Sequence, residues 1–571
     1  MAKFLGAMDN YTPASSKGEN GHQQYSWSSV KSAPVDMTLS AIEELIVQIS
    51  FQLVRTKTAK PDVIQKYRSL LARLKNGLDG PENSQAYKEY LVLLVKLCAH
   101  TRDIVAGKGE YSLAYMMLNA LFDLFPEIAL VVMRNFVLLE VDGVSVHPYG
   151  SWKDIKYIME FPGSNEAACI VNDQLRRDEE DMKQGKSVSL AGKWVPREKS
   201  KFGRHFEALA CDYYADIIAS SKEETRDKAV NLCKMKYRKL LSALNKHLDT
   251  TQVKQCSGEW RDIVPEKVTS VTLFRNKKAF LNVDKKGNKR ASNRDRIECS
   301  EHFNSFLARA KEGKVEVKGK RIGLNEFTQQ ALDLISKGRK SQSEVDMLNL
   351  QWKSNSAQNG ALENFVPLVD VSGSMDGDPL HAAIALGIRI AEKSKLGKRV
   401  LTFTTSPKWV NLDGKNNFVD MVEEVKKAEW GMATNFAAAL RLILAVIKEQ
   451  KMTAEEVKEI SLVVLSDMMI DQADKNYNSM FDMIEKEYAD VGRSICGEPY
   501  APPHIVFWNL RSTSGFPSLS KQKNTSMLSG FSPVLLNLFC EKGVACLEDF
   551  TPWAMLKESL SNPRYNVFDR I

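Results

Sequence analysis

Three segments in the second half of the chain carry hydroxyl and carboxylate side chains at spacings that suit a metal ion. Asp370, Ser372 and Ser374 form a D-x-S-x-S pattern, Thr434 lies in a later loop, and Asp467 comes later still. Alternate residues of a tight loop can direct a carboxylate and two hydroxyls at one point, and we expect Gly373 to let the backbone turn there. Oxygen-only ligands favour a hard cation, Mg²⁺ or Mn²⁺, over zinc.

Short apolar runs must position these segments, because two of the segments directly follow such a run. Runs typical of β-strands cover residues 365–369, 399–404, 460–465 and 504–510, and helical patterns alternate with them. This alternation predicts a mainly parallel, doubly wound (Rossmann-like) α/β domain over residues 361–571. Loops at the carboxyl ends of the strands form the binding crevice of such a sheet. Pro367 cannot donate to a ladder, so we expect the first strand to be short or bulged.

A helix is predicted directly after the D-x-S-x-S loop. Asp378-Pro379 is a typical helix start, and an apolar stripe follows at Leu380, Ala383, Ile384, Ile388 and Ala391. Another helix is expected to begin near Phe436, which would put Thr434 at its start. A D-x-S-G-S stretch alone is also typical of an Asx-capped turn, so the prediction of a metal site depends on all three segments together.

The order of the three segments resembles the metal-ion-dependent adhesion site of von Willebrand factor A domains. That resemblance implies direct coordination by Ser372, Ser374 and Thr434, with Asp370 and Asp467 acting mostly through water. It also implies an open coordination position that an acidic group of a protein partner fills. The function implied is adhesion without turnover, so we expect no enzyme activity.

The first half of the chain is predicted to be helical. Residues 1–36 are polar and rich in Ser, Gly, Asn and Lys, which is typical of a disordered tail. Residues 37–350 are predicted to form an α-helical repeat domain, HEAT-like in its paired helices, with a basic insertion at about 180–322. The predicted fold is therefore a helical array followed by the α/β domain.

Positive charge is concentrated in the middle of the chain. Residues 183–321 contain 33 Lys and Arg against 17 Asp and Glu, whereas the whole chain has a net charge of only +8. Such a segment attracts polyanions, nucleic acid first among them. Trp194, Phe202, Tyr237 and Phe274 are interleaved and could stack on bases. The candidate phosphate contacts are Lys193, Arg197, Lys199, Lys201, Arg204, Lys236, Arg238, Lys277, Lys278, Lys285, Lys286, Lys289 and Arg290. The alternative is an ordinary solvated basic face.

Two further motifs lie in the helical half. Residues 102–110, R-D-I-V-A-G-K-G-E, and residues 147–154, H-P-Y-G-S-W-K-D, resemble segments of Ro autoantigen-like (TROVE) proteins. Those proteins have the same order, helical repeats first and a von Willebrand factor A domain last. The resemblance implies a ring of helical repeats whose basic residues bind RNA.

A second resemblance spans most of the chain. The segments 370–375, 466–468, 507–511 and 528–533 are similar to those of an uncharacterised family of eukaryotic and large DNA virus proteins, known only as a domain of unknown function. No activity comes with that resemblance. It adds the possibility of a viral origin and of a place in a virus particle.

Composition limits the remaining functions. The nine cysteines are scattered, and Cys299 and His302 have no second pair nearby to complete a zinc site, so we expect a reducing compartment, most simply the cytoplasm. No apolar run is long enough to predict a membrane span. The sequence favours a non-enzymatic RNA-binding protein with a cation site for an acidic partner. Its alternatives are a protein-interaction or assembly module and, more weakly, a metal-dependent nuclease without an evident general base.

Overall fold

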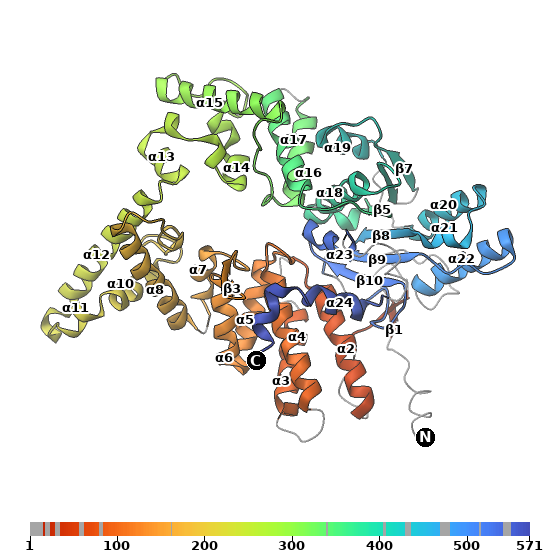
Figure 1. Cartoon of the computed structure of the whole chain (residues 1–571), viewed down its shortest axis with the longest axis horizontal. Helices are drawn as coiled ribbons and strands as arrows, with labels where there is room; N and C mark the ends of the chain where they lie inside the picture. Colours follow the sequence, from red (N-terminus) through yellow and green to blue (C-terminus); the bar gives the residue numbers. More distant parts are fainter. Residues whose placement is uncertain are drawn as a thin grey trace. The chain divides into compact units, whose positions relative to one another are not determined.

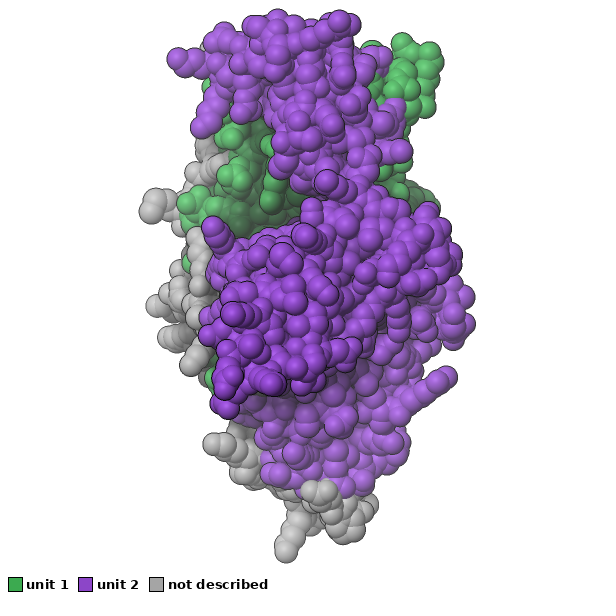
Figure 2. All heavy atoms as spheres, turned by 90° about the vertical axis from the view of Figure 1, so that its left-hand side faces the viewer, with its two compact units in different colours: residues 1–66, 269–277, 306–562 green, residues 67–268, 278–305, 563–571 purple. Residues whose placement is uncertain are grey.

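The chain folds into two compact units, neither of which is one continuous stretch (Figures 1 and 2). Unit 1 combines residues 1–66, 269–277 and 306–562, and unit 2 combines residues 67–268, 278–305 and 563–571. The predicted domain boundaries follow sequence order and so differ from these units. The computed structural model describes residues 15–17, 23–28, 35–55, 62–78, 84–161, 163–338, 341–403, 407–428, 435–468, 480–512, 515–540 and 550–571.

Unit 1 is built on a six-stranded sheet with the order β10-β9-β8-β5-β6-β7. Neighbouring strands are parallel except at the edge, where β7 runs antiparallel to β6. From β5 the next strands, β6 and β7, are added on one side, and from β8 the next strands, β9 and β10, are added on the other side. The strand order therefore reverses between β5 and β8, the two central strands. Such a reversal opens a crevice at the carboxyl ends of the strands. The strands are β5 (Asn364–Asp370), β6 (Arg399–Phe403), β7 (Lys408–Asn411), β8 (Ile460–Ser466), β9 (His504–Asn509) and β10 (Thr525–Ser529).

The four strands predicted from the sequence are β5, β6, β8 and β9, and the mainly parallel sheet is confirmed. The expectation that Pro367 makes the first strand short or bulged is wrong. β5 is a regular strand of seven residues that pairs with β8 over its length, Pro367 lying opposite Val463. Its ladder with β6 begins only at Leu368, so the missing N–H of Pro367 leaves no gap on that side.

Helices cover the sheet with their apolar sides. α18 (Asp378–Lys393) packs on β5, β6 and β8, and its predicted stripe from Leu380 to Ala391 is buried. Each fully buried Ile or Leu of that stripe contributes about 1.5–3 kcal/mol. α16 (Leu324–Ser336) packs on α18 and on α19 (Phe418–Lys426), and α17 (Gln342–Ser356) packs on α19. α20 (Phe436–Glu449) packs on β6 and on α22 (Met480–Cys496).

The helix predicted to open the helical domain belongs to the sheet unit instead. α2 (Val35–Gln52) packs on β10 and on α24 (Pro552–Leu560), as Figure 1 shows. Side chains of the sheet cap its last carbonyls: Asn509 Nδ2 donates to the carbonyl of Phe51 at 3.1 Å, and Ser529 Oγ donates to that of Ser50 at 2.8 Å. These bonds satisfy acceptors that a helix end leaves open.

The prediction of a disordered tail is wrong for part of residues 1–36. β1 (Ser15–Lys17) and β2 (Gln23–Tyr25) pair as a hairpin. The backbones of Tyr25 and Phe516 exchange hydrogen bonds of 3.1 and 3.0 Å, and the Trp27 ring packs edge-on against Phe516. An aromatic contact with the sheet unit orders this polar segment, and composition alone gave no sign of it.

Unit 2 is helical over most of its described residues. α4 (Ser84–Arg102), α5 (Tyr111–Leu124) and α6 (Pro126–Asn135) pack together, as do α8 (Ser164–Lys183), α10 (Phe206–Tyr213) and α12 (Arg226–His247). The 3-10 helix η9 (Pro563–Phe568) packs on α4. Across the described part of the whole chain, no helix is both long and apolar enough to span a membrane.

One hairpin interrupts the helices of unit 2. β3 (Leu139–Val141) and β4 (Val144–Val146) pair antiparallel around Asp142 and Gly143. Both turn residues have positive φ angles, 50° and 76°, as a two-residue turn between twisted strands requires. The turn is therefore specified locally by Asp-Gly.

Candidate metal centre at the carboxyl edge of the sheet

The central strands bring two carboxylates to one place. Val369 of β5 lies opposite Leu465 of β8, so the two strands end level with each other. Asp370 is the last residue of β5, and Asp467 directly follows β8. Both aspartates are completely buried, at the point where the strand order reverses. Two of the three predicted segments therefore meet at the carboxyl edge of the sheet.

Hydrogen bonds fix the Asp370 carboxylate. Its Oδ1 accepts the backbone N–H of Ser372 at 2.9 Å, and its Oδ2 accepts the hydroxyl of Ser466 at 2.6 Å. The same Ser466 hydroxyl accepts the N–H of Met468 at 3.0 Å, and Met468 has a φ of 63°. The loop after β5 and the end of β8 are thus both hydrogen-bonded to the Asp370 carboxylate. The turn after β8 depends on the positive φ angle of Met468.

The hydroxyls of the D-x-S-x-S loop lie side by side. Ser372 Oγ and Ser374 Oγ are 3.1 Å apart, the first buried and the second partly exposed. Gly373 does not have the special backbone conformation that we expected, and a Cβ added there would meet nothing within 4 Å. The left-handed glycine is Gly377, with φ 90°, directly before α18. The loop makes a 3-10 turn at Gly373–Met375, the position that requires glycine is Gly377, and Gly373 leaves open space beside the serines.

Without a cation, it is unfavourable for the carboxyl groups of Asp370 and Asp467 to be ionised together. Burial, and next the neighbouring carboxylate of Asp467, raise the pKa of Asp370 to about 7. The hydrogen bonds from Ser372 and Ser466 act in the opposite direction and offset only part of this rise. Two buried carboxylates close together need positive charge beside them to stay ionised.

Arg511 supplies some of that charge, and sequence reasoning missed it. Its NH1 donates to the carbonyl of Ser374 and lies 4.0 Å from Asp467 Oδ2, while half of the side chain is exposed. The backbone N–H of Arg511 donates to the side chain of Asn509, the last residue of β9, at 3.1 Å. Two signals were available: Arg511 comes just beyond a predicted strand, and it belongs to segment 507–511, which is similar to the family of unknown function.

The fifth predicted ligand cannot be compared with the other four. Thr434 lies in residues 429–434, outside the described residues. The helix expected after it is present: α20 begins at Phe436, and the side chain of Asn435 caps it by accepting the N–H of Ala438 at 3.0 Å. The structure thus brings together Asp370, Ser372, Ser374 and Asp467.

The donor set of this site suits a hard cation. It consists of carboxylate and hydroxyl oxygens without sulfur or imidazole, as Mg²⁺ or Mn²⁺ prefers. In the described residues no group of three or more His, Cys, Asp or Glu is arranged to hold a metal, so a cation here would depend on serine hydroxyls as well as on the two carboxylates. Cys299 and His302 also point to separate partners: Cys299 Sγ donates to the carbonyl of Phe280 at 3.8 Å, and the His302 ring pairs with the carbonyl of Arg261 at 3.1 Å.

The predicted phosphate contacts fall into three groups. Arg204 and Arg238 are in ion pairs with Glu160 and Glu198, and Lys193 and Arg197 bond to Gln252 and to the carbonyl of Gly192. Lys277 is buried, donates to Gln330 and lies 3.9 Å from Glu344, so its prediction as a phosphate contact is wrong. Of the remaining residues Lys278 is partly exposed, and the others are exposed: Lys199, Lys201, Lys236, Lys285, Lys286, Lys289 and Arg290.

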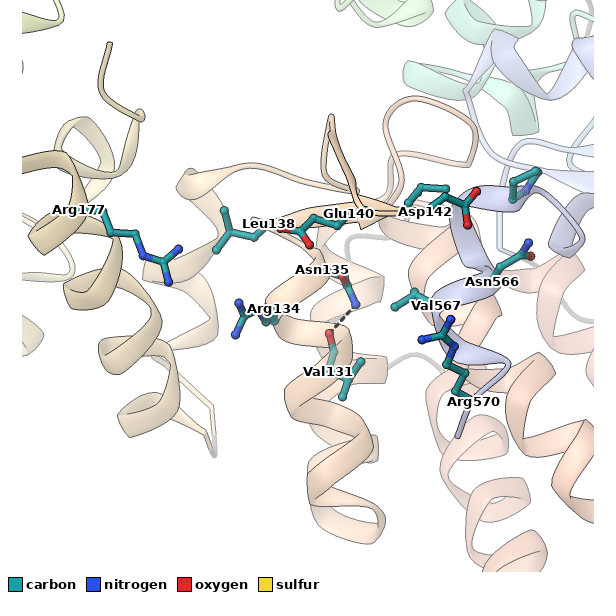
Figure 3. A pocket seen from close by; sticks show the side chains of 13 residues that line it. Val131, Arg134, Asn135, Leu138, Glu140, Asp142, Arg177, Asn566, Val567 and Arg570 are labelled. Carbon is teal, nitrogen blue, oxygen red and sulfur yellow. Dashed lines mark hydrogen bonds between the residues drawn. The ribbon is translucent and has the colours of Figure 1, made fainter. Parts of the chain in front are cut away.

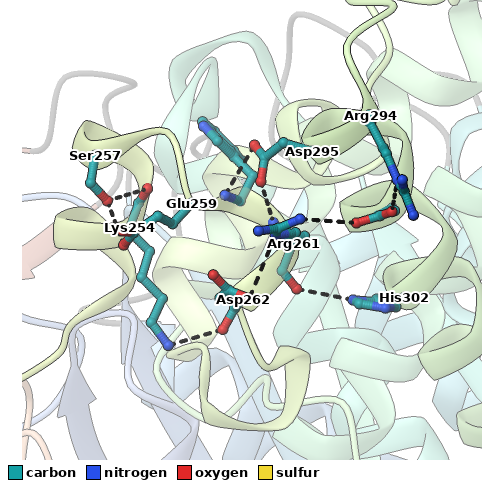
Figure 4. Close-up of polar contacts among 10 residues, drawn as sticks. Lys254, Ser257, Glu259, Arg261, Asp262, Arg294, Asp295 and His302 are labelled. Carbon is teal, nitrogen blue, oxygen red and sulfur yellow. Dashed lines mark hydrogen bonds and ion pairs between the residues drawn. The ribbon is translucent and has the colours of Figure 1, made fainter.

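Some basic side chains of the middle segment, residues 183–321, are paired with acidic side chains of the same unit. Figure 4 shows one such network in unit 2, where Arg294 Nε donates to Glu298 at 2.6 Å and Asp295 accepts the backbone N–H groups of Trp260 and Arg261. In contrast, the turn formed by residues 285–290 has its basic side chains exposed. Asp284 shapes it by accepting the N–H groups of Lys286 and Asn288 at 2.7 and 2.9 Å.

A lysine and aromatic cluster was only partly foreseen. The ammonium groups of Lys153, Lys156 and Lys193 lie 5.8, 4.9 and 5.7 Å from the centre of the Trp194 ring. Lys156 also lies 5.6 Å from the ring of Phe202. Partial burial, and next the charge of Lys153, lower the pKa of Lys156. Three like charges around one indole favour the approach of an anion.

The two motifs similar to Ro proteins form buried ion pairs. Arg102 donates from Nε and NH2 to Asp154 at 2.8 and 2.9 Å, and the hydroxyl of Tyr115 adds a bond of 2.7 Å. The neighbouring Asp103 accepts Arg564 Nε at 2.8 Å. These residues join α4, the 147–154 segment and the C-terminal segment within unit 2, so their contacts account for them structurally.

Comparisons with known proteins give a family. Two family models match the chain, each described as a domain of unknown function: DUF7788 over residues 364–561 and DUF2828 over residues 164–357. Over 503 residues the chain is 30% identical to an uncharacterised protein of Acanthamoeba polyphaga mimivirus, and the match covers 83% of this chain and 80% of that protein. The chain belongs to the family of that mimivirus protein.

This family includes a large-virus protein, as the second resemblance predicted. The DUF7788 match begins at the first residue of β5 and contains the sheet together with all five predicted cation ligands and Arg511. The DUF2828 match covers α8 to α17 and contains Lys193, Trp194 and Phe202, whereas Lys153 and Lys156 lie before its first residue. Because the descriptions of the family give no activity, its function has to be argued from these sites.

Proposed function

We propose that this protein is a divalent-cation-dependent binding protein whose sheet unit is a von Willebrand factor A-type domain. One Mg²⁺ or Mn²⁺ would be held by Asp370, Ser372, Ser374, Thr434 and Asp467. The cation leaves a coordination position that a carboxylate of an acidic protein partner fills. Binding, without chemical turnover, is the function.

One observation carries this proposal. Asp370 and Asp467 are both completely buried and lie next to each other at the strand reversal, with the hydroxyls of Ser372 and Ser374 beside them. Two neighbouring buried carboxylates destabilise a fold unless a cation offsets their charge. The strand order β10-β9-β8-β5-β6-β7, with its antiparallel edge, supports the same assignment.

The residues around the cation have separate tasks. Ser466 and the N–H of Ser372 orient the Asp370 carboxylate, so one oxygen cannot rotate away from the ion. Half of the Arg511 side chain is exposed beside Asp467, and in this proposal its guanidinium would pair with the carboxylate of a partner. The cation supplies the Lewis acidity that binds the partner's carboxylate.

Isothermal titration of the full chain with Mn²⁺ in chelator-treated buffer tests the cation site. One bound ion per chain is expected, and Ser372→Ala combined with Ser374→Ala should lower its affinity at least about tenfold, because each lost ligand weakens a hard-ion site. Ser461→Ala is the matched control. Ser461 is a buried serine on β8 at the opposite end from the site, so its loss should leave Mn²⁺ affinity unchanged.

The partner chemistry has its own test. A glutamate-containing peptide titrated into the Mn²⁺-loaded protein should bind, whereas its glutamine counterpart should not, and neither should bind after chelation. Equal binding of both peptides, or peptide binding that survives chelation, contradicts the proposed role of the cation.

RNA binding is a second candidate, and the lysine and aromatic cluster around Trp194 favours it. Aromatic rings beside ammonium groups suit unpaired bases and the phosphates that join them. In this second proposal the helical half of the chain, with its basic middle segment, binds RNA as the resemblance to Ro proteins implies, and the cluster around Trp194 is part of the binding surface.

Fluorescence anisotropy with a labelled single-stranded RNA tests this second function. Affinity should fall steeply as salt is raised, and Lys156→Glu or Trp194→Ala should weaken it about tenfold. Lys353→Glu, a reversal of one exposed charge on α17, should have a much smaller effect. If Lys156→Glu and Lys353→Glu weaken RNA binding equally, the cluster around Trp194 is not a binding site and the RNA is attracted only by the overall positive charge.

A further inference from the structure

Unit 2 contains a cavity of about 440 Å³ that the sequence did not indicate. α6, the β3–β4 hairpin, α8 and the C-terminal segment around η9 line it (Figure 3). Pockets of this volume hold ligands of the size of a nucleotide. All of its lining residues belong to unit 2, whereas every proposed cation ligand belongs to unit 1. The cavity is therefore a second site with its own chemistry.

Three arginines line this cavity from three separate elements. Arg134 lies in the last turn of α6, Arg177 on α8, and Arg570 just after η9. All three are exposed, and no described residue forms an ion pair or a hydrogen bond with their guanidinium groups. Like charges on one hollow raise its potential, and guanidinium groups match the oxygens of a phosphate with paired N–H donors.

Two carboxylates complete the lining. Glu140 lies on β3 and Asp142 in the adjoining turn, and Figure 3 shows both along the hairpin with Arg134 and Arg570 below them in that view. Neither carboxylate pairs with an arginine of the cavity. An ionised carboxylate only accepts hydrogen bonds, so these groups suit the hydroxyls of a ligand, not its phosphate.

We propose that this cavity binds a phosphate-bearing small molecule with free hydroxyl groups, of the nucleotide class. Arg134 and Arg177 bind the phosphate oxygens, and Arg570, on the other side of Arg134 in Figure 3, adds positive charge to the cavity. Glu140 and Asp142 accept hydrogen bonds from the hydroxyls, as they would from a ribose. The Asp-Gly turn, with both φ angles positive, places Asp142 at the edge of the cavity.

Isothermal titration of the full chain with AMP, inorganic phosphate and adenosine tests the ligand class. AMP should bind more tightly than phosphate, adenosine should not bind measurably, and added salt should weaken both phosphate compounds. The proposal is overturned if AMP gives no binding at millimolar concentration, or if adenosine binds as well as AMP.

Matched variants assign the binding to this cavity. Arg134→Gln and Arg177→Gln should each lower AMP affinity about tenfold or more, because each removes a charge-assisted bond to phosphate. Arg226→Gln removes an exposed arginine of α12 that is not part of the lining, and should leave affinity unchanged. Equal effects at Arg134 and Arg226 would overturn the assignment.

Asp142→Asn separates the two halves of the site. Asparagine is favoured in the same type of turn, so the hairpin should persist. AMP affinity should fall severalfold, while affinity for inorganic phosphate should stay the same or rise because a negative charge has gone. A parallel loss for AMP and phosphate would contradict the proposed role of the hairpin.

Discussion

Asp370→Asn should make the cation-free protein more stable and at the same time remove its response to Mn²⁺. The substitution keeps the size and shape of the side chain, and Oδ1 can still accept the N–H of Ser372. It removes one of two neighbouring buried negative charges. A purely structural carboxylate would show the opposite result, because breaking its bonds only destabilises the fold.

The pKa gives the size and the pH window of this effect. Asp370 has a pKa of about 7 in the folded protein against 3.8 for an ordinary aspartate, a difference that corresponds to about 4 kcal/mol. The pKa of Asp370 is higher in the folded protein than in the unfolded chain. Below about pH 4 the carboxyl group is protonated in both states, so it does not change the free energy of unfolding. As the pH rises towards 7 the free energy of unfolding falls, and above about pH 7 it is lower by the full difference of about 4 kcal/mol. The bond from Ser466 contributes about 1 kcal/mol, so the net gain for asparagine is about 3 kcal/mol near pH 8.

Urea denaturation in EDTA and in Mn²⁺, near pH 4 and near pH 8, measures both effects. The wild type should gain about 2.7 kcal/mol when Mn²⁺ is present at a hundred times its Kd, and Asp370→Asn should gain nothing. In EDTA the variant should exceed the wild type near pH 8 but not near pH 4. A variant less stable than the wild type near pH 8 in EDTA, or an equal Mn²⁺ response in both proteins, refutes the reasoning.

Three other substitutions have expected outcomes. Arg511→Gln should raise Mn²⁺ affinity severalfold in titration calorimetry, because a guanidinium near Asp467 repels the ion; lower affinity would contradict this. Asp154→Asn should cost about 3–5 kcal/mol in urea denaturation, since it leaves the buried Arg102 without its counter-charge, and a loss below about 1 kcal/mol would be inconsistent with that pair. Arg389→Leu should cost about 2–4 kcal/mol, because buried Arg389 donates to Asn355 and Asn359; an unchanged urea midpoint would show that these bonds contribute little.

The centre of the sheet could be predicted because its signals are local. Apolar runs bounded by polar residues indicated β5, β6, β8 and β9, and the residues that end β5 and follow β8 had to lie at one edge. The edge strands gave weaker signals. β7 has only four residues, of which only Val410 is buried, and β10 is largely polar in sequence, Thr-Ser-Met-Leu-Ser, although all five residues are buried.

Long-range packing explains most of what the sequence did not predict. α2 joins the sheet unit through Asn509 and Ser529, more than 450 residues away, and no local pattern encodes that contact. The burial of Lys277 depends on Gln330 and Glu344 in the same way. The β3–β4 hairpin is different, since Asp142-Gly143 between valines is a local signal that was available.

Crystals of the full chain grown with Mn²⁺ and measured for anomalous scattering would test the central claim most directly. The account predicts one strong peak within coordination distance of the Ser372 and Ser374 hydroxyls, with Asp370, Asp467 and Thr434 around it. The peak should be missing from crystals of Asp370→Asn. Density for the ion at another place in the sheet unit, with this site closed by Arg511, would contradict it.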